Sequence, residues 1–240
     1  IKGANYIPQD NSQSRVSDED YEYIIKSAAD VNMNMLRVWG GGIYQEDVFY
    51  ELCDKYGILV WQDFMFACGM FPSSGEYYQS VQKEVVDNVK RIRNHACLAL
   101  YCGNNENDIV YYGWGMKEDT PPKYHEEYER TLEKLFHEVI PGALATVDTT
   151  RYYHPTSPNT GYSDIPLSRG DVHYWGVWHG EEPFEEFNNN VGRFMSEYGF
   201  QSYPDIESVK KFTVKEDRDV FSDVMVSHQR CRGKTGKDFE

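Results

Sequence analysis

The sequence of 240 residues has no apolar stretch that could cross a membrane, and it is poor in positive charge. A membrane-spanning helix needs about 20 consecutive apolar residues, and no such run occurs. The 24 lysines and arginines are outnumbered by 39 aspartates and glutamates, which gives a formal net charge of −15. Because so negative a protein repels phosphate groups, we expect neither nucleic acid nor an anionic membrane as a partner.

The few cysteines offer no metal-binding pattern. No Cys-x-x-Cys pair and no His-Glu-x-x-His motif occurs, so the sequence predicts neither a metal site nor any other cofactor. Free thiols buried in strands and helices are the expected state of these residues. The 5 cysteines are Cys53, Cys68, Cys97, Cys102 and Cys231.

Aromatic residues, by contrast, are abundant. They make up 15% of the chain, with 19 tyrosines and 5 tryptophans. These two side chains combine an apolar face with a polar group and can stack on sugar rings, although ordinary packing accounts for most of them. The length suits one large domain, and α/β barrels are typically about this long.

Seven short runs, mostly apolar and followed by glycine or polar residues, predict β-strands. Helical spacing of apolar residues predicts helices between several of them, and a loop rich in tyrosine and glycine is predicted around Trp114. The predicted strands cover residues 1–7, 34–39, 58–64, 97–102, 151–154, 171–175 and 192–200. The predicted helices begin near Ser17 and cover about 48–56, 78–92, 122–139 and 205–212.

This alternation predicts right-handed βαβ units and a parallel sheet. An open, doubly wound sheet should have a glycine-rich phosphate turn after its first strand, and residues 1–8 contain none. The favoured fold class is therefore α/β, a (β/α)8 TIM barrel. An eighth strand is missing from the basic, polar tail at 221–240. Because an unclosed barrel exposes strand edges, residues 1–240 are expected to be the catalytic barrel domain of a longer multidomain chain.

Two of the predicted strands each carry a glutamate near the carboxyl end. Residues 97–102 run into Gly-Asn-Asn-Glu, which ends at Glu106, and the last predicted strand contains Glu197. A single glutamate in such a place is more simply explained as a helix cap or a solvated side chain. A pair of carboxyl groups at the mouth of one barrel suits glycoside hydrolysis, and in retaining enzymes they stand about 5–5.5 Å apart.

Electrostatics predicts different protonation states for the pair. At about 5 Å and an effective dielectric constant near 20, two carboxylates repel by about 3 kcal/mol, so one is expected to keep its proton near neutral pH. Arg37, at the end of the second strand, is the cation expected to keep Glu197 ionised. Glu106 lies beside neutral amides and is the better candidate for the acid. Glu197 would then attack the anomeric carbon while Glu106 protonates the leaving oxygen and later acts as a base towards water.

Several motifs resemble the catalytic barrel of the β-mannosidases of glycoside hydrolase family 2. They are Lys-Gly-Ala-Asn-Tyr-Ile-Pro at 2–8, Asn-Met-Asn-Met-Leu-Arg-Val-Trp-Gly-Gly-Gly at 32–42 and Trp-Gln-Asp-Phe-Met-Phe-Ala at 61–67. Further along are Gly-Asn-Asn-Glu at 103–106, Gly-Asp-Val-His-Tyr-Trp at 170–175 and Ser-Glu-Tyr-Gly-Phe-Gln-Ser at 196–202. The resemblance extends in order from about residue 2 to residue 204.

The resemblance implies a retaining exo-enzyme that removes terminal β-linked mannose, with flanking β-domains in the same polypeptide. It makes Glu106 the acid/base and Glu197 the nucleophile, and it places Asn105 on the sugar 2-hydroxyl. The further residues that it places around the terminal sugar are Trp39, Asp63, Trp114, His173, Tyr174 and Trp175.

Most of these additional residues also have a structural explanation. Asp63 could serve only to orient Arg37, and His173 could be a structural hydrogen bonder. Tyr174 could donate a hydrogen bond to Glu197 or simply pack. Trp61 is expected in the core more than at the sugar, and Trp39 the reverse. Trp175 and Trp178 are expected to divide between the site and packing.

Two other functions remain open at this level. The same site could take a β-galactoside, a β-glucuronide or a β-glucosaminide, because discrimination rests on single hydroxyl groups. The chain could also be a sugar-binding domain that has lost catalysis, although the presence of both glutamates and Arg37 argues against that.

Overall fold

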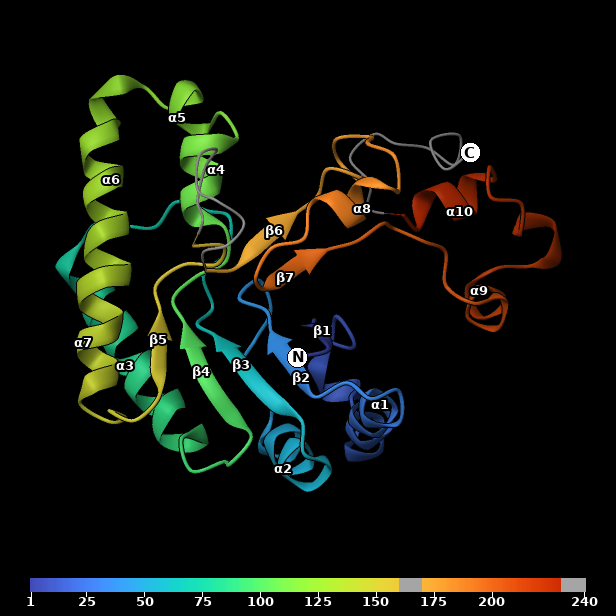
Figure 1. Cartoon of the computed structure of the whole chain (residues 1–240), viewed down its shortest axis with the longest axis horizontal. Helices are drawn as coiled ribbons and strands as arrows, with labels where there is room; N and C mark the ends of the chain where they lie inside the picture. The colour runs from blue at the N-terminus through green and yellow to red at the C-terminus, as the bar shows by residue number, and fades with distance from the viewer. Residues whose placement is uncertain (160–169, 230–240) are drawn as a thin grey trace. The chain divides into compact units, whose positions relative to one another are not determined.

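The computed structural model describes residues 1–159 and 170–229, which fall into two compact units. The first unit is Ile1–Gly199, an α/β structure around a parallel sheet (Figure 1). The second begins at Phe200, and its described part contains the helices α9 (Ile206–Phe212) and α10 (Asp223–Ser227). Residues 230–240 of the predicted strandless tail, including Cys231, lie outside the described range.

All seven predicted strands are present. Five of them form one parallel sheet in the order β1-β2-β3-β4-β5, and β6 and β7 form a second parallel pair. The strands of the first sheet are β1 (Gly3–Tyr6), β2 (Met35–Val38), β3 (Leu59–Asp63), β4 (Leu98–Cys102) and β5 (Tyr152–His154). Those of the second are β6 (Val172–Tyr174) and β7 (Met195–Tyr198). The α/β class and the parallel strand order are thus confirmed.

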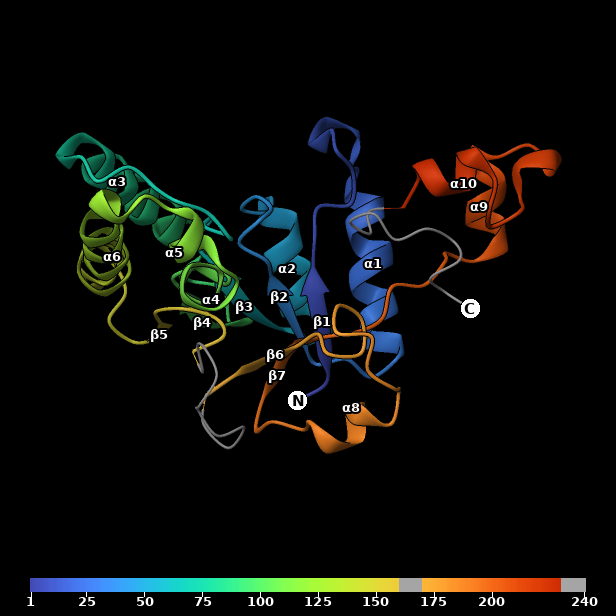
Figure 2. The same ribbon diagram turned by 90° about the horizontal axis from the view of Figure 1, so that it is seen from above.

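The helices follow the predicted spacing, and two of them, α1 and α3, begin at a serine whose side chain caps the helix. Ser17 forms a capping box with Asp20 at the start of α1, Ser74 caps α3, and Gly57 ends α2 with a φ of +70° that glycine tolerates without strain. The bounds are α1 (Asp18–Asp30), α2 (Asp47–Tyr56), α3 (Gly75–Ile92), α6 (His125–Glu133), the π-helix Lys134–Val139 and α7 (Ile140–Ala145). Figure 2 shows α1, α2 and α3 on one face of the five-stranded sheet and β6, β7 and α8 (Glu186–Asn189) on the other.

The predicted loop around Trp114 is wrong, because this region is largely helical. It forms α4 (Asn107–Gly113) and α5 (Met116–Asp119), with Trp114 at the end of the first helix. Val110 and Tyr111 are buried, and this burial outweighs the weak helical preference of the tyrosines and glycines.

Among the described residues, no helix is both long and apolar enough to cross a membrane.

Two apolar clusters lie on opposite faces of the sheet because successive strand residues alternate in direction. The larger fills the space between the sheet and the helices. The smaller consists of Met35, Trp61 and Cys102, with partly buried residues including Phe194 packed against it. Arg37 is two residues from Met35 and opposite Trp61 in register. It therefore lies on the face of this smaller cluster, at the end of the strands where the predicted site residues gather.

Candidate active site

Glu106 stands at a sharp turn immediately after β4. Its φ of +62° is unusual for a residue other than glycine, and its backbone N–H donates to the carbonyl of Ser157 at 2.7 Å. Asn105 continues the line of β4 through bridges to Ala67 and Ser157. Strained backbone of this kind is commonly retained where a side chain must be aimed for function. The turn aims the carboxyl group of Glu106 into the site.

Glu197 projects from β7 towards the same point. It lies opposite His173 of β6 in register, so the two side chains share a face. One oxygen of Glu197 accepts a 2.7 Å bond from Nη1 of Arg37, and the other accepts a 3.3 Å bond from the indole N–H of Trp175. The side chain is only 8% exposed.

The two glutamates are close enough to act on one bond. Carboxylate oxygens of Glu106 and Glu197 lie within 4.8 Å of each other. Retaining glycosidases hold their carboxyl groups about 5–5.5 Å apart, whereas inverting enzymes leave room for a water at about 6.5–9.5 Å. The short separation fits direct attack by one carboxylate. The sequence predicts this proximity, with Arg37 beside Glu197, and the structure has it.

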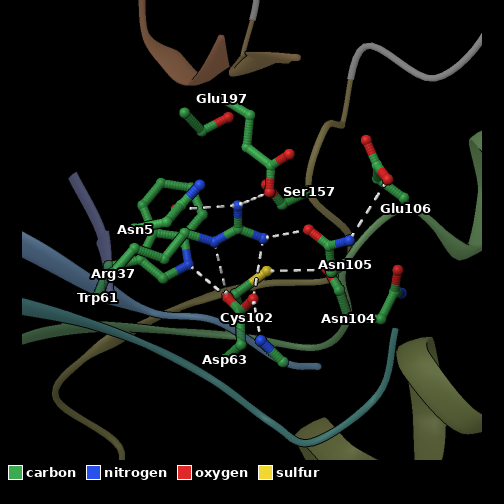
Figure 3. Close-up of polar contacts among 12 residues, drawn as sticks. Asn5, Arg37, Trp61, Asp63, Cys102, Asn104, Asn105, Glu106, Ser157 and Glu197 are labelled. Carbon is green, nitrogen blue, oxygen red and sulfur yellow. Dashed lines mark hydrogen bonds and ion pairs between the residues drawn. The ribbon is translucent and has the colours of Figure 1, made fainter. Parts of the chain in front are cut away.

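Arg37 connects most of the polar groups of the site. Figure 3 shows its guanidinium between Asp63, Asn105 and the carboxylate of Glu197. Nη2 donates to Asp63 at 2.9 Å and to Asn105 at 2.8 Å. Burial alone would lower the pKa of Arg37, but the carboxylates of Asp63 and Glu197 raise it further above its usual value. Arg37 is thus a permanent positive charge.

The surroundings of Glu197 act on its charge in opposite directions. Burial raises the pKa of this carboxyl above its usual value, while a positive charge on His173 and the guanidinium of Arg37 would lower it. The sequence predicts only the second effect. The predicted ion pair between Arg37 and Glu197 is present, but burial outweighs it and leaves the pKa of Glu197 raised, contrary to the expectation from the sequence.

Glu106 is not surrounded by neutral amides alone, as the sequence suggests. One of its oxygens lies 2.7 Å from Nδ1 of His173, and the other lies 3.4 Å from the thiol of Cys68. Cys68 is exposed and lies outside the strands and helices, contrary to the expectation of buried thiols. Desolvation by the atoms around its sulfur still raises the pKa of Cys68 to about 12, so the thiol stays protonated near neutral pH and can donate to Glu106. Sequence reasoning missed Cys68 and Ser157. Their positions shortly after β3 and β5 are the signal that could have found them.

Asp63 is held in place by hydrogen bonds, whereas the ring of Trp39 is held by packing. Asp63 is fully buried and accepts hydrogen bonds from the indole N–H of Trp61 at 2.7 Å and from the backbone N–H of Gly40 at 3.0 Å, besides those from Arg37. Its oxygens are thus occupied in orienting Arg37. The partly buried ring of Trp39 packs against Gly41, where an added Cβ would lie 1.9 Å from a ring atom.

Tyr174 and Trp114 are placed differently from the residues that contact the two glutamates. The hydroxyl of Tyr174 donates to Glu182 and not, as the sequence allowed, to Glu197. Strand alternation explains the difference, because Tyr174 follows His173 and therefore points to the opposite face. Trp114 is 50% exposed at the end of α4. A role for either in sugar binding stays a prediction.

Two groups of ionisable side chains among the described residues are close enough to be considered for a metal ion. One is Glu106, His173 and Glu197, and the other is Asp54, His95 and Cys97. In the second group, Asp54 already accepts bonds from His95 and from the backbone N–H of Cys97. We assign no ion to either group, because hydrogen bonds account for both arrangements.

Comparison with known proteins identifies relatives along almost the whole chain. It is 37% identical over 215 residues to β-mannosidase B of Thermothelomyces thermophilus, covering 88% of this chain and 25% of that protein. It is 38% identical over 228 residues to the β-mannosidase of Bos taurus, covering 90% of this chain and 25% of that protein. The chain thus spans about a quarter of the length of these relatives. No protein-family model matches it.

Comparison with solved structures also finds similarity to a β-mannosidase. The β-D-mannosidase from Dictyoglomus thermophilum superposes with a TM-score of 0.87 at 40% sequence identity, over 99% of this chain and 28% of that one. The β-glucuronidase 2 of Bacteroides uniformis superposes with a TM-score of 0.58 at 19% identity, over 81% of this chain and 24% of that one. At this lower identity, the second likeness concerns the fold alone.

Proposed function

We propose, from the membership of this chain in the β-mannosidase family, that it carries the active site of a retaining exo-enzyme that removes terminal β-linked mannose from the non-reducing end of a carbohydrate. The observation that carries the mechanism is the separation of Glu106 and Glu197, whose carboxylate oxygens lie within 4.8 Å. This distance supports formation of a covalent sugar ester on one of them.

In the proposed first step, Glu197 attacks the anomeric carbon and Glu106 gives its proton to the departing oxygen. In the second step, water attacks the same carbon, Glu106 takes the proton from that water, and the bond to Glu197 breaks. Arg37, at 2.7 Å from Glu197, aligns the carboxylate for attack and stabilises it when it is released. Trp175 supports the other oxygen through its indole N–H.

Asn105 is proposed to hold the sugar 2-hydroxyl. Its carbonyl oxygen is occupied by Arg37 at 2.8 Å, which turns its amide nitrogen towards Cys68 and Glu106, each 3.5 Å away. Both of these contacts are long, so we propose that the amide nitrogen donates to the 2-hydroxyl in their place when the sugar binds. A bond to the 2-hydroxyl that strengthens in the transition state accelerates the reaction more than one that binds substrate and transition state alike.

The remaining predicted residues are proposed to form the wall around the terminal sugar. Trp39 and Trp175 lie at or just beyond the ends of β2 and β6, where they can present ring faces. Asp63 is proposed to act through Arg37, from which it accepts two hydrogen bonds. Trp114 and Tyr174 would have to reach the sugar from further out.

The catalytic unit is proposed to be a (β/α)8 barrel within a longer polypeptide that also contains flanking β-domains. In support, the parallel order β1 to β5 is followed by the parallel pair β6 and β7, and β7 contacts β1. The coverage of about a quarter of the relatives' length also supports further domains. The predicted domain extent, residues 1–240, stays a prediction.

Turnover of nitrophenyl β-glycosides by the complete polypeptide tests the proposed activity. We expect the β-mannoside to be hydrolysed far faster than the β-galactoside, β-glucuronide or β-glucosaminide, and Glu197→Ala to lower its turnover by several orders of magnitude. Faster turnover of another glycoside would replace mannose as the substrate. Unchanged activity in Glu197→Ala would end the enzymatic proposal and favour a sugar-binding domain.

A second variant tests the role of Glu106. A substrate with a good leaving group needs little protonation, so Glu106→Ala should lose much less activity on dinitrophenyl β-mannoside than on an alkyl β-mannoside. Equal losses on both substrates would contradict the assignment of Glu106 as the acid.

A further inference from the structure

His173 lies between the two glutamates and is almost completely buried. Its Nδ1 is 2.7 Å from an oxygen of Glu106 and 3.5 Å from an oxygen of Glu197, and its side chain is 1% exposed. Its other ring nitrogen, Nε2, is 3.0 Å from the hydroxyl of Ser157. A histidine ring held at both nitrogens has a tautomer that depends on its neighbours.

The hydroxyl proton of Ser157 is committed away from His173. The Ser157 hydroxyl donates to Asp171 at 2.6 Å, a shorter contact than the one to the ring, and the acceptor is charged. Burial alone would raise the pKa of Asp171, but hydrogen bonds from His154, Ser157 and Ser196 hold it well below its usual value. Asp171 therefore remains an ionised acceptor.

The hydrogen bonds that link Asp171, Ser157 and His173 determine which ring nitrogen of His173 carries a hydrogen. Since a serine hydroxyl has one hydrogen, the oxygen of Ser157 can only accept from His173, and Nε2 must carry a hydrogen. The neutral ring then has a bare Nδ1. At 2.7 Å from a carboxylate oxygen of Glu106, a bare nitrogen would meet a lone pair unless a proton lies between them.

We propose that the chain Asp171–Ser157–His173 stores the catalytic proton on the Glu106–His173 pair, with Ser157 and His173 as positioning residues that act through Glu106. The inference rests on the function proposed above and deepens it. The titratable groups that face this pair are Glu197, Asp171 and the thiol of Cys68. Arg37 reaches it through Glu197 and through the side chain of Asn105.

The stored proton fits both halves of the reaction. When the bond from the anomeric carbon to the leaving oxygen breaks and the bond to Glu197 forms, the proton between Glu106 and His173 moves to that oxygen. When water later forms its bond to the carbon and the bond to Glu197 breaks, the pair takes a proton back from the water. The pair thus begins and ends each cycle with the same number of protons.

The opposite tautomer would make a poorer acid. With the hydrogen on Nδ1 and none on Nε2, the ring would donate to an ionised Glu106, and the pair would hold one proton fewer. Loss of the Ser157 hydroxyl removes the acceptor that excludes this tautomer. The consequence is a specific kinetic defect, confined to the acid step and to higher pH.

Ser157→Ala, Ser157→Thr and Ser196→Ala variants of the complete polypeptide test this with two β-mannosides. We expect Ser157→Ala to move the basic limb of the pH–kcat profile on an alkyl β-mannoside by about one unit towards lower pH, with kcat above neutral pH lowered about 10-fold. Turnover of dinitrophenyl β-mannoside should change by less than about 2-fold, since that substrate needs little acid assistance. Ser157→Thr retains the hydroxyl and should restore the limb.

Ser196→Ala is the matched control, because Ser196 donates to the same oxygen of Asp171 without contacting His173. It should leave the position of the basic limb unchanged. The proposal is overturned if Ser157→Ala lowers turnover of both substrates equally at all pH values, or if Ser196→Ala moves the limb as far as Ser157→Ala does.

A measurement independent of turnover separates this inference from the proposed activity. Nitrogen-15 NMR of the histidine rings in the resting protein, assigned with His173→Asn, reports which nitrogen carries hydrogen. We expect a protonated Nε2 in the wild type and loss of that signal pattern in Ser157→Ala. A bare Nε2 in the wild type would refute the proton chain even if β-mannosides are hydrolysed, and a protonated Nε2 would support it even if they are not.

Discussion

At the scale of single residues, the candidate site depends on one buried cation between two buried anions. Arg37, Asp63 and Glu197 have side chains that are 5%, 0% and 8% exposed, and Arg37 contacts both carboxylates within 2.9 Å. A buried ion pair contributes little net stability compared with apolar residues of the same shape, but removing one partner leaves an uncompensated charge. The arrangement therefore makes the geometry of Glu197 dependent on Arg37.

Replacing Arg37 with methionine should be costly for both stability and activity. Two buried carboxylates lose their partner, so the free energy of unfolding should fall by about 3–5 kcal/mol in a urea titration of the complete polypeptide. Lys26→Met is the control, because Lys26 and Asp30 form a pair in which the side chains are 54% and 62% exposed. That change should cost less than about 0.5 kcal/mol. Similar costs for the two variants would contradict the account of the buried network.

Asp171 makes the stability depend on acid pH. Its pKa in the folded state is held below the unfolded value of about 3.9, so its contribution is present above that value and is lost as pH falls through the folded pKa. We expect the wild type to lose stability more steeply than Asp171→Asn between about pH 4 and pH 2. Urea titrations of both proteins across this interval measure the difference. Parallel curves would show that Asp171 does not contribute in this way.

At the scale of secondary-structure elements, the sequence was sufficient where apolar runs or helical spacing were strong. All seven strands and the long helix α3 follow from such patterns. Helix α4 does not, because its helical state depends on burial of Val110 and Tyr111. The single turn of α5 has no buried residue and no apolar pattern that would predict it. The ends of the strands gave the positions of the two glutamates and Arg37.

Contacts between side chains from different loops could not be predicted in the same way. His173 meets Glu106 at a separation of 67 in residue number, and Ser157 meets Asp171 at a separation of 14. The residue types of Ser157 and Cys68 do not mark such a role, and only their positions shortly after β5 and β3 point to it. The sequence therefore places Glu106 beside neutral amides, whereas its nearest side-chain partner is the imidazole ring of His173.

The junction of β4 and β5 provides a test at this scale. A Cβ added to Gly103 would lie 2.2 Å from the carbonyl oxygen of Pro155, so Gly103→Ala must push the strand ends apart. We expect it to destabilise the protein by more than about 1 kcal/mol and to lower turnover by displacing Glu106. Gly142→Ala is the control, because Gly142 lies in α7 with nothing within 4 Å of the added atom.

Helix propensity predicts that Gly142→Ala stabilises the protein by about 0.5–1 kcal/mol without changing turnover. Urea titration and β-mannoside hydrolysis of both variants provide the comparison. A Gly103→Ala protein as stable and active as the wild type would show that the close approach of these strand ends is not needed to position Glu106.

At the scale of the whole molecule, several strand edges have no hydrogen-bonded neighbour within the described residues. β1 and β5 are at the edges of the five-stranded sheet, and β6 and β7 form only a pair. Exposed edges of this kind lead to association between chains unless something covers them. Together with the quarter-length match to the relatives, this supports the proposal that other parts of a longer polypeptide complete the barrel.

Residues 1–240 produced alone should therefore associate and be inactive, whereas the complete polypeptide should be monodisperse and hydrolyse β-mannosides. Size-exclusion chromatography and turnover measured on the two proteins under the same conditions test this. A monodisperse segment with the full turnover of the complete polypeptide would contradict the proposed domain organisation.

The central claim is that Glu197 forms a covalent bond to the sugar while Glu106 supplies the proton. Incubation of the complete polypeptide with 2-deoxy-2-fluoro-β-mannosyl fluoride, followed by proteolysis and mass spectrometry, tests it most directly. The 2-fluorine slows both formation and breakdown of the ester, while the anomeric fluoride is a good leaving group that keeps formation fast enough for the ester to accumulate. The account predicts one fluoromannosyl group on the peptide that contains Glu197. A label on Glu106, or release of the sugar with inverted configuration and no adduct, would contradict it.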